Sequence, residues 1–294
     1  DFPMACRNVR SAIMLGGGLL LQCFQVAHAA PYSVYTAKLT ELDGSGVSGS
    51  VTVFVTSTGL MGIGEAAGLE TFIKDEANSG SNCTKTNACG AHVHNGSSCS
   101  SSSVQGGHYF NGDTDPWTKV GYGITDADGM GSFKFDVTTS AKSVDQKPFI
   151  VHDNAGGRVA CGILKEVTVD LWNASLAPLS LSGSSSGVKG SVTIHKTSTG
   201  LVGAGAADGL EKSLSSQANG GNDCKSTNGC GVHVHSGTAC TDAESQGDHY
   251  YTGDTDPWTN VVYDKTDGKG FASFVFMVTN GATNITDKPF IVHN

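Results

Sequence analysis

The sequence predicts an all-β protein built from two domains of the sandwich or barrel type. Three observations support this prediction: a glycine-rich composition (40 of 294 residues) with only 15% charged residues, short alternating runs closed by turn residues, and a long internal repeat. A chain of this length can bury two cores of ordinary domain size. Turn-rich chains with few charges are more typical of β proteins than of helical or disordered ones.

The expected strands are short runs in which hydrophobic and polar residues alternate. Examples are 51–55 and 132–137, and Asp128-Gly129 supplies a hairpin turn. Such strands at regular spacing are typical of sandwiches and barrels. One helix-like stretch, 68–77, has weak periodicity, and we expect it to form a surface insertion of a turn or two.

A repeat with a constant offset relates the two halves of the chain. The segment 112–118, Gly-Asp-Thr-Asp-Pro-Trp-Thr, recurs unchanged at 253–259, which is an offset of 141 residues (253 − 112), and the other distinctive residues follow without a gap. Two copies of such length should be self-sufficient globules. We therefore predict one domain over 30–170 and a second over 171–294.

The first 29 residues have the layout of a signal peptide. Arg7 and Arg10 precede an apolar run over 12–24, and small residues stand at Ala27 and Ala29. The run is short and interrupted by glycines, so we do not expect it to span a bilayer. We predict that 1–29 is removed from a secreted protein without a transmembrane segment, and association with the cell wall or cell surface remains open.

The net charge and the glycosylation sequons indicate which partners and modifications the surface can have. The formal net charge is −9 and no basic stripe occurs along the chain, so we expect no nucleic-acid partner. The sequence does not indicate the oligomeric state. Four asparagines in Asn-X-Ser/Thr sequons are candidate glycosylation sites: Asn82, Asn95, Asn173 and Asn284.

Eight histidines fall at matched positions in the two halves. Since side chains alternate along a strand, His92 and His94 share one face of a predicted strand. Lone histidines are usually surface or hydrogen-bonded residues, but this matched pattern indicates metal ligation, and four imidazoles suit Cu(II), although imidazole also binds zinc, iron and nickel. We expect one copper in each half. The two sets are His92, His94, His108 and His152, and His233, His235, His249 and His293.

These residues and their neighbours resemble the copper/zinc superoxide dismutase family. The resemblance is carried by 90–94 (Gly-Ala-His-Val-His), Cys99, 107–111 (Gly-His-Tyr-Phe-Asn), 149–152 (Phe-Ile-Val-His) and 157–162 (Gly-Arg-Val-Ala-Cys-Gly). It implies two tandem Greek-key β-barrels that convert superoxide to dioxygen and hydrogen peroxide. It also implies that the histidines bind copper, that Cys99 and Cys161 form the family disulfide, and that Arg158 guides the anion.

Two departures from the family pattern predict a copper-only member with tandem repeats. No histidine lies between His108 and His152, where the family has its zinc ligands, and 152–158 is too short for the family's long charged loop. We therefore expect no zinc and a copper more open to solvent.

Without zinc, His108 needs another partner for its second ring nitrogen. Asp113 or Asp115 is the candidate, and Asp254 or Asp256 takes the same place in the second half. The alternative is that this acidic segment is only a well-capped turn. His108 is also the expected proton carrier, so His108 and Arg158 are the catalytic candidates.

The remaining cysteines predict local disulfides. We expect Cys83 to pair with Cys89 and Cys224 with Cys230, because secretion favours oxidised thiols. The alternative is a zinc site formed by Cys83, Cys89, His92 and His94. Cys240 has no partner within the repeat, because position 302 (161 + 141) lies beyond Asn294, so we expect the second repeat to be truncated at its C-terminus.

The function expected from the sequence is that of a secreted copper-only superoxide dismutase, with superoxide as its small-molecule substrate. One alternative is a non-enzymatic extracellular copper-binding or matrix protein that reuses the fold. Another is a copper-dependent oxidase or peroxidase of organic substrates, for which the short loops build no obvious pocket. A rate measurement with superoxide would separate these functions.

Overall fold

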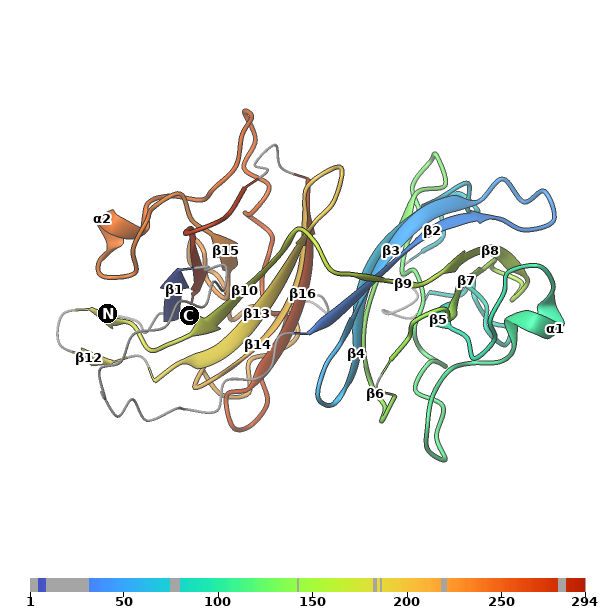
Figure 1. Ribbon diagram of the computed structural model, residues 1–294, viewed down its shortest axis with the longest axis horizontal. Coiled ribbons are helices and arrows are strands. Elements are labelled where there is room, and N and C mark those ends of the chain that lie inside the picture. The colour runs from blue at the N-terminus through green and yellow to red at the C-terminus, as the bar shows by residue number, and fades with distance from the viewer. Residues whose placement is uncertain are drawn as a thin grey trace. The chain divides into compact units, whose positions relative to one another are not determined.

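The chain divides into two compact units whose regular secondary structure is almost entirely β. The computed structural model describes residues 5–8, 32–74, 80–141, 143–181, 184–185, 187–217, 221–279 and 284–293. The first unit is Tyr32–Val169, and the second is Asp170–Asn294 together with the N-terminal residues (Figure 1). Strands make up 40% of the chain and helices 3%, which confirms the all-β prediction.

The first unit is a nearly closed, antiparallel, barrel-like sheet of eight strands (Figure 1). The strands follow one another in the order β5 (Ala91–Val93), β7 (Pro148–His152), β8 (Arg158–Ile163), β2 (Ser33–Glu41), β3 (Ser48–Val55), β4 (Gly59–Ala67) and β6 (Gly131–Thr138), and β9 (Lys165–Val167) also pairs with β2. A short helix, α1 (Ser102–Gln105), lies between β5 and β6 in the chain.

In the core of the first unit, aromatic side chains of one strand pack over glycines of the neighbouring strand. Every second residue of β6 is buried, which places Phe133 and Phe135 inside. The neighbouring strand β4 has glycines where these rings lie: a Cβ atom at Gly62 would overlap the Phe135 ring, and one at Gly64 would overlap the Phe133 ring. The high glycine content therefore serves close packing as well as turns.

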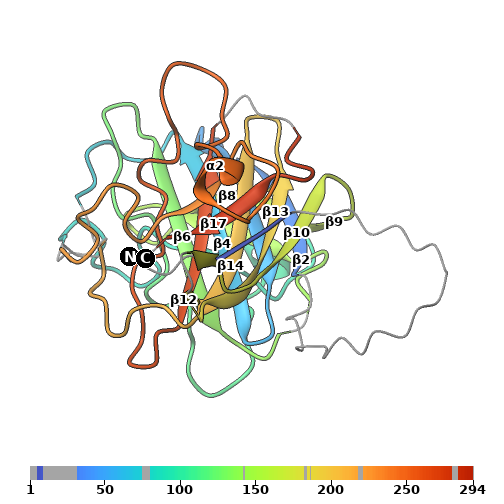
Figure 2. The same ribbon diagram turned by 90° about the vertical axis from the view of Figure 1, so that its left-hand side faces the viewer.

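The second unit contains three smaller sheets within its described residues (Figure 2). The first sheet has the order β10 (Leu171–Leu176), β13 (Lys189–Lys196), β14 (Leu201–Asp208) and β16 (Ala272–Val278). The second is β1 (Ala5–Asn8), β17 (Pro289–Val292) and β15 (Val232–Val234), and the third pairs β11 (Ser180–Leu181) with β12 (Ser184–Ser185). Helix α2 (Ala243–Gln246) follows β15.

Strand register shows where the sequence offset holds and where it does not. Val51 pairs with Gly64 in the first unit, and Val192 pairs with Gly205 in the second, at the predicted offset of 141. By contrast, Tyr35 faces Val53 while Trp172 faces Ile194, so the first strands differ by 137 (172 − 35). The expectation of a repeat without gaps is wrong here, because four extra residues (141 − 137) separate β10 from β13.

The N-terminal strand β1 extends the sheet next to β17. Cys6 stands opposite Ile291, just as Cys161 stands opposite Ile150 in the first unit, again at an offset of 141 (291 − 150). Strand β1 therefore has the register in the second unit that β8 has in the first. We had excluded 1–29 from the fold, and the rest of that predicted signal segment lies outside the described residues, so its removal stays a prediction.

Two local expectations concern helices. The described residues 68–74 contain turns and bends but no helix, so the helix-like pattern of 68–77 does not form one there, and 75–79 lies outside the description. A search of the described residues for a long apolar helix able to cross a membrane found none.

Disulfides form in the three expected pairs: Cys83–Cys89, Cys99–Cys161 and Cys224–Cys230. The sulfurs of Cys83 and Cys89 are thus taken up by each other rather than offered to zinc. The expectation that Cys240 has no partner is wrong, because Cys240 is disulfide-bonded as well.

Removing the two disulfides of the first unit should cost different amounts of stability. Cys99 and Cys161 are separated by 62 positions, whereas Cys83 and Cys89 are separated by 6. Because a longer closed loop restricts the unfolded chain more, we expect losses of about 4 kcal/mol for the first pair and about 2 kcal/mol for the second. Urea unfolding of the two double Cys→Ser variants would measure this difference, and equal losses would contradict the expectation.

Candidate metal centres

The four histidines of the first unit come from two neighbouring strands and one adjoining segment. His92 lies in β5 and His152 ends β7, which pairs with β5. His94 follows β5 and forms an antiparallel bridge with His108. One ring nitrogen of each histidine lies within 4.8 Å of the corresponding nitrogens of the other three. The structure thus brings together all four residues that the sequence selected.

Each ring has one nitrogen fixed by the protein and one left free. The fixed nitrogens donate to acceptors: His92 Nε2 to the Val120 carbonyl (2.8 Å), His94 Nδ1 to the Gly106 carbonyl (2.9 Å), His152 Nδ1 to the Gly156 carbonyl (3.1 Å), and His108 Nδ1 to Asp115 Oδ2 (2.6 Å). In a neutral imidazole the other nitrogen then carries a lone pair. Those nitrogens, Nδ1 of His92 and Nε2 of the other three, are buried without a hydrogen-bond partner. Four convergent lone pairs suit a metal ion.

Burial keeps three of the four rings neutral. His92, His94 and His152 are each 1% exposed. Burial, together with the charges of neighbouring histidines, lowers the pKa of His92 to about 2, that of His94 to about 3 and that of His152 to about 4. Neutral imidazole is the form that binds metals, so these three rings are ready for ligation at neutral pH.

The second unit repeats this donor set. One nitrogen from each of His233, His235, His249 and His293 lies within 4.8 Å of the others. Nδ1 of His233 and Nε2 of His249 are buried without partners, and burial lowers the pKa of His233 to about 2 and that of His293 to about 3. The rings are fixed by similar acceptors: Val261 for His233 (3.0 Å), Gly247 for His235 (2.7 Å) and Asp256 for His249 (2.6 Å).

Asp115 and Asp256 are the carboxylates that orient the third histidine of each set. Asp115 Oδ1 also accepts the backbone N–H of Trp117 at 2.9 Å, so one side chain both closes the turn and holds His108. We had treated a capped turn and a carboxylate that orients His108 as alternatives, and Asp115 fulfils both roles. The other two candidates, Asp113 and Asp254, are exposed.

Trp117 is a supporting residue that we did not select from the sequence. It is fully buried, its indole N–H donates to the Tyr109 carbonyl at 2.8 Å, and its ring centroid lies 6.0 Å from that of His92. Trp258 makes the same contacts beside His233. The signal for both was the unchanged recurrence of 112–118 at 253–259, which we had used only to define the repeat.

Arg158 lies beside the first histidine set. Its guanidinium donates to the Ser102 carbonyl (2.9 Å), to Gln105 Oε1 (2.8 Å) and to the Gly106 carbonyl (2.7 Å), which also accepts His94 Nδ1. Its charge contributes to the lowered pKa of His94. No salt bridge to Arg158 occurs among the described residues, so its positive charge is not neutralised by a paired carboxylate.

The sequon asparagines Asn82, Asn95, Asn173 and Asn284 are all exposed. Asn95 directly follows His94, and its Oδ1 accepts the backbone N–H of Gly107 at 3.0 Å. This bond closes the turn that connects His94 with His108.

No protein-family model matches the chain, and the search for similar curated proteins also found no match. The resemblance to the copper/zinc superoxide dismutases therefore rests on the residues of the chain itself.

Replacing Asp115 with Asn should weaken metal binding in the first unit. The variant loses the charge that orients His108, and such supporting carboxylates typically contribute 10- to 100-fold in metal affinity. We expect a loss of about 10-fold in copper affinity at one of the two sites, measured by competition with a chelator. Asp113→Asn removes the same charge from the exposed end of the turn and should leave both affinities unchanged; equal effects of the two variants would exclude the proposed role of Asp115.

The metal-free protein should lose stability as the pH falls below about 6.5. Because the folded-state pKa values of His92, His94 and His152 are about 2 to 4, the unfolded chain takes up protons first, and the free energy of unfolding decreases by roughly 1.4 kcal/mol per pH unit for each such histidine. The contribution of these histidines to the free energy of unfolding is fully present above pH 6.5, and it is lost as the pH falls toward their folded-state pKa values. Thermal unfolding across that range would test it, and a constant midpoint would be inconsistent with buried neutral rings.

Proposed function

We propose that the protein is a secreted copper-only superoxide dismutase with one copper site in each of two tandem Greek-key β-barrels, related to the copper/zinc superoxide dismutases. The observation that carries the proposal is the convergence, in each unit, of ring nitrogens from four histidines within 4.8 Å, with the other nitrogen of every ring in the first set held by the protein. The expected signal segment and the disulfides support an extracellular location.

The donor set favours copper over zinc. Structural zinc sites in proteins usually include thiolates, and catalytic zinc sites usually have three protein ligands. Here each site offers four imidazoles, and every cysteine in the described loops near them is oxidised. Four nitrogen donors suit the tetragonal geometry of Cu(II).

The chain's own residues would bind the anion and move protons. When bound, copper supplies electron transfer by cycling between Cu(II) and Cu(I). Arg158 attracts superoxide, because a nearby unpaired charge outweighs a distant net charge of −9 that is screened beyond roughly 8 to 10 Å. His108 is held at Nδ1 by Asp115, so its Nε2 is the atom at which a proton can be carried into the site. In total, two superoxide anions and two protons yield dioxygen and hydrogen peroxide.

A second candidate function is copper binding without fast turnover, as in an extracellular storage or matrix protein. The two histidine sets themselves favour it, because four converging ligand atoms suffice to bind copper and are present in both units. The two functions predict the same metal content and differ only in rate.

Metal analysis combined with superoxide turnover tests the proposal directly. We expect two coppers and no zinc per chain, with turnover of superoxide by the secreted protein. Bound copper without turnover would support the storage function instead, and zinc in the histidine sites would refute the copper assignment.

Replacing Arg158 with Ala should slow superoxide turnover while copper stays bound. Loss of the local positive charge should lower the second-order rate constant by about 10-fold and flatten its dependence on ionic strength. Pulse radiolysis at several salt concentrations would measure both effects. Arg158→Lys should restore part of the rate. Lys134→Ala, which removes an exposed positive charge from β6, should change neither; an unchanged rate in Arg158→Ala would refute the guiding role.

A further inference from the structure

A buried tyrosine and a glutamate contact the main chain at the last histidine of the first metal centre. Tyr122 is 1% exposed, and its hydroxyl lies 3.0 Å from the His152 carbonyl oxygen and 3.3 Å from Glu70 Oε2. The second oxygen of Glu70 accepts the backbone N–H of Asn154 at 3.3 Å. Together, Glu70 and Tyr122 contact His152 and the turn that follows it.

This turn determines where the His152 ring lies. The ring donates through Nδ1 to the Gly156 carbonyl, and Asp153 closes the turn by accepting the N–H of Gly157 at 2.7 Å. The pairing of β7 with β8 shifts register between Val151 and His152, although His152 still faces Arg158 and its backbone N–H donates to the Gly90 carbonyl at 2.8 Å. Contacts to the turn add to this pairing at the point where the strand ladder becomes irregular.

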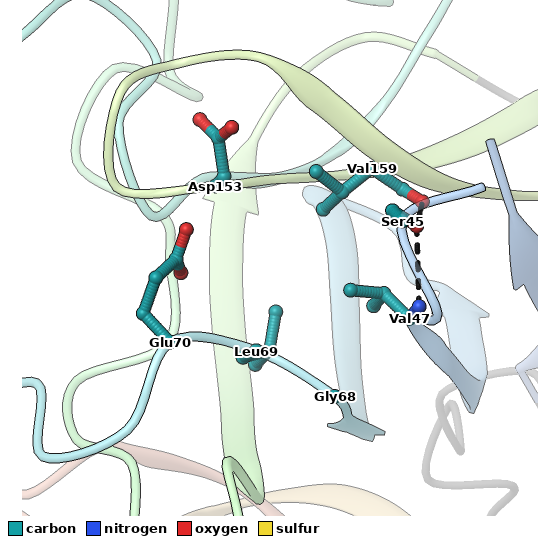
Figure 3. Close-up of a pocket in the computed structure, with 7 residues that line it drawn as sticks. All are labelled: Ser45, Val47, Gly68, Leu69, Glu70, Asp153 and Val159. Atoms are coloured by element: carbon teal, nitrogen blue, oxygen red, sulfur yellow. Dashed lines mark hydrogen bonds between the residues drawn. The ribbon is translucent and has the colours of Figure 1, made fainter. Parts of the chain in front are cut away.

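Glu70 reaches the turn across a small cavity. Figure 3 shows the carboxylates of Glu70 and Asp153 on neighbouring sides of this cavity, with Leu69 and Val159 among its other lining residues. The cavity has a volume of about 260 Å³. Burial and the charge of Glu70 raise the pKa of Tyr122, so its hydroxyl stays protonated and remains a donor.

We propose that Glu70 and Tyr122 are positioning residues of the first metal centre, which hold His152 and its turn so that His152 Nε2 points at the ion. This inference rests on the proposed metal site and adds to it two residues that touch neither the ion nor the substrate. They act through the main chain of His152 and Asn154.

The second unit contains a natural control for this inference. Tyr263 and Glu211 stand at the offset of 141 from Tyr122 and Glu70 (263 − 122 and 211 − 70). Tyr263 is fully buried and its backbone N–H donates to the Cys230 carbonyl, as that of Tyr122 does to Cys89. However, the Tyr263 hydroxyl has no hydrogen-bond partner. The two rings are packed alike, but only the Tyr122 hydroxyl contacts the centre.

The test compares Tyr122→Phe with Tyr263→Phe in the copper-loaded full chain. Both variants remove one buried hydroxyl and keep the ring. We expect Tyr122→Phe to change the Cu(II) electron paramagnetic resonance spectrum of half of the bound copper and to speed its release to a chelator by about 10-fold. Tyr263→Phe should leave the spectrum and both release phases unchanged.

Glu70→Gln keeps the side chain's size and provides a second test if Tyr122→Phe does not fold. We expect a change in the same half of the spectrum, smaller than that of Tyr122→Phe, since Gln retains one acceptor oxygen. Unchanged spectra and release rates in the variants of both residues, or equal effects of Tyr122→Phe and Tyr263→Phe, would overturn the proposal. Failure of the wild-type chain to bind copper would instead refute the proposed function.

Discussion

The architecture of each centre depends on one constraint: four imidazoles must converge on one point while the buried ones remain neutral. Burial lowers the pKa of His92, His94 and His152 far below the usual value, and it leaves one nitrogen per ring without a partner. Unpaired polar atoms in a protein interior destabilise the fold. Four such histidine nitrogens in the first unit and two in the second are explained if a metal ion takes the place of the missing partners.

The second nitrogen of each ring shows how the fold meets this constraint. Backbone carbonyls hold three of the four rings in the first unit, and Asp115 holds His108. Carbonyl acceptors fix the tautomer without adding charge. The single carboxylate gives His108 a different electrostatic environment from its neighbours. A barrel edge with adjoining turns can supply such acceptors close together, which a single helix could not.

The sequence allowed the histidine sets to be predicted because strand periodicity and a constant offset are local signals. It also narrowed the partner of His108 to two residues, and only the fold distinguished Asp115 from Asp113. Other features depend on tertiary contacts. The shift of β10 by four residues lies in a Ser- and Gly-rich segment with no distinctive anchor, and the bonding of Cys240 could not follow from a rule based on the repeat. Nothing in the sequence around Tyr122 indicated that its hydroxyl reaches His152.

The two centres share their ligand atoms and the Asp and Trp contacts that support them. Both sets bring their ligand atoms within 4.8 Å, and both have the Asp and Trp contacts of the repeated turn. Around the first centre, Arg158 also donates to the Gly106 carbonyl, and the Tyr122 hydroxyl lies 3.0 Å from the His152 carbonyl oxygen. Arg158 and Tyr122 contact these carbonyls rather than the free ring nitrogens. Any effect that they have on the first centre must therefore act through the groups that hold its ligands.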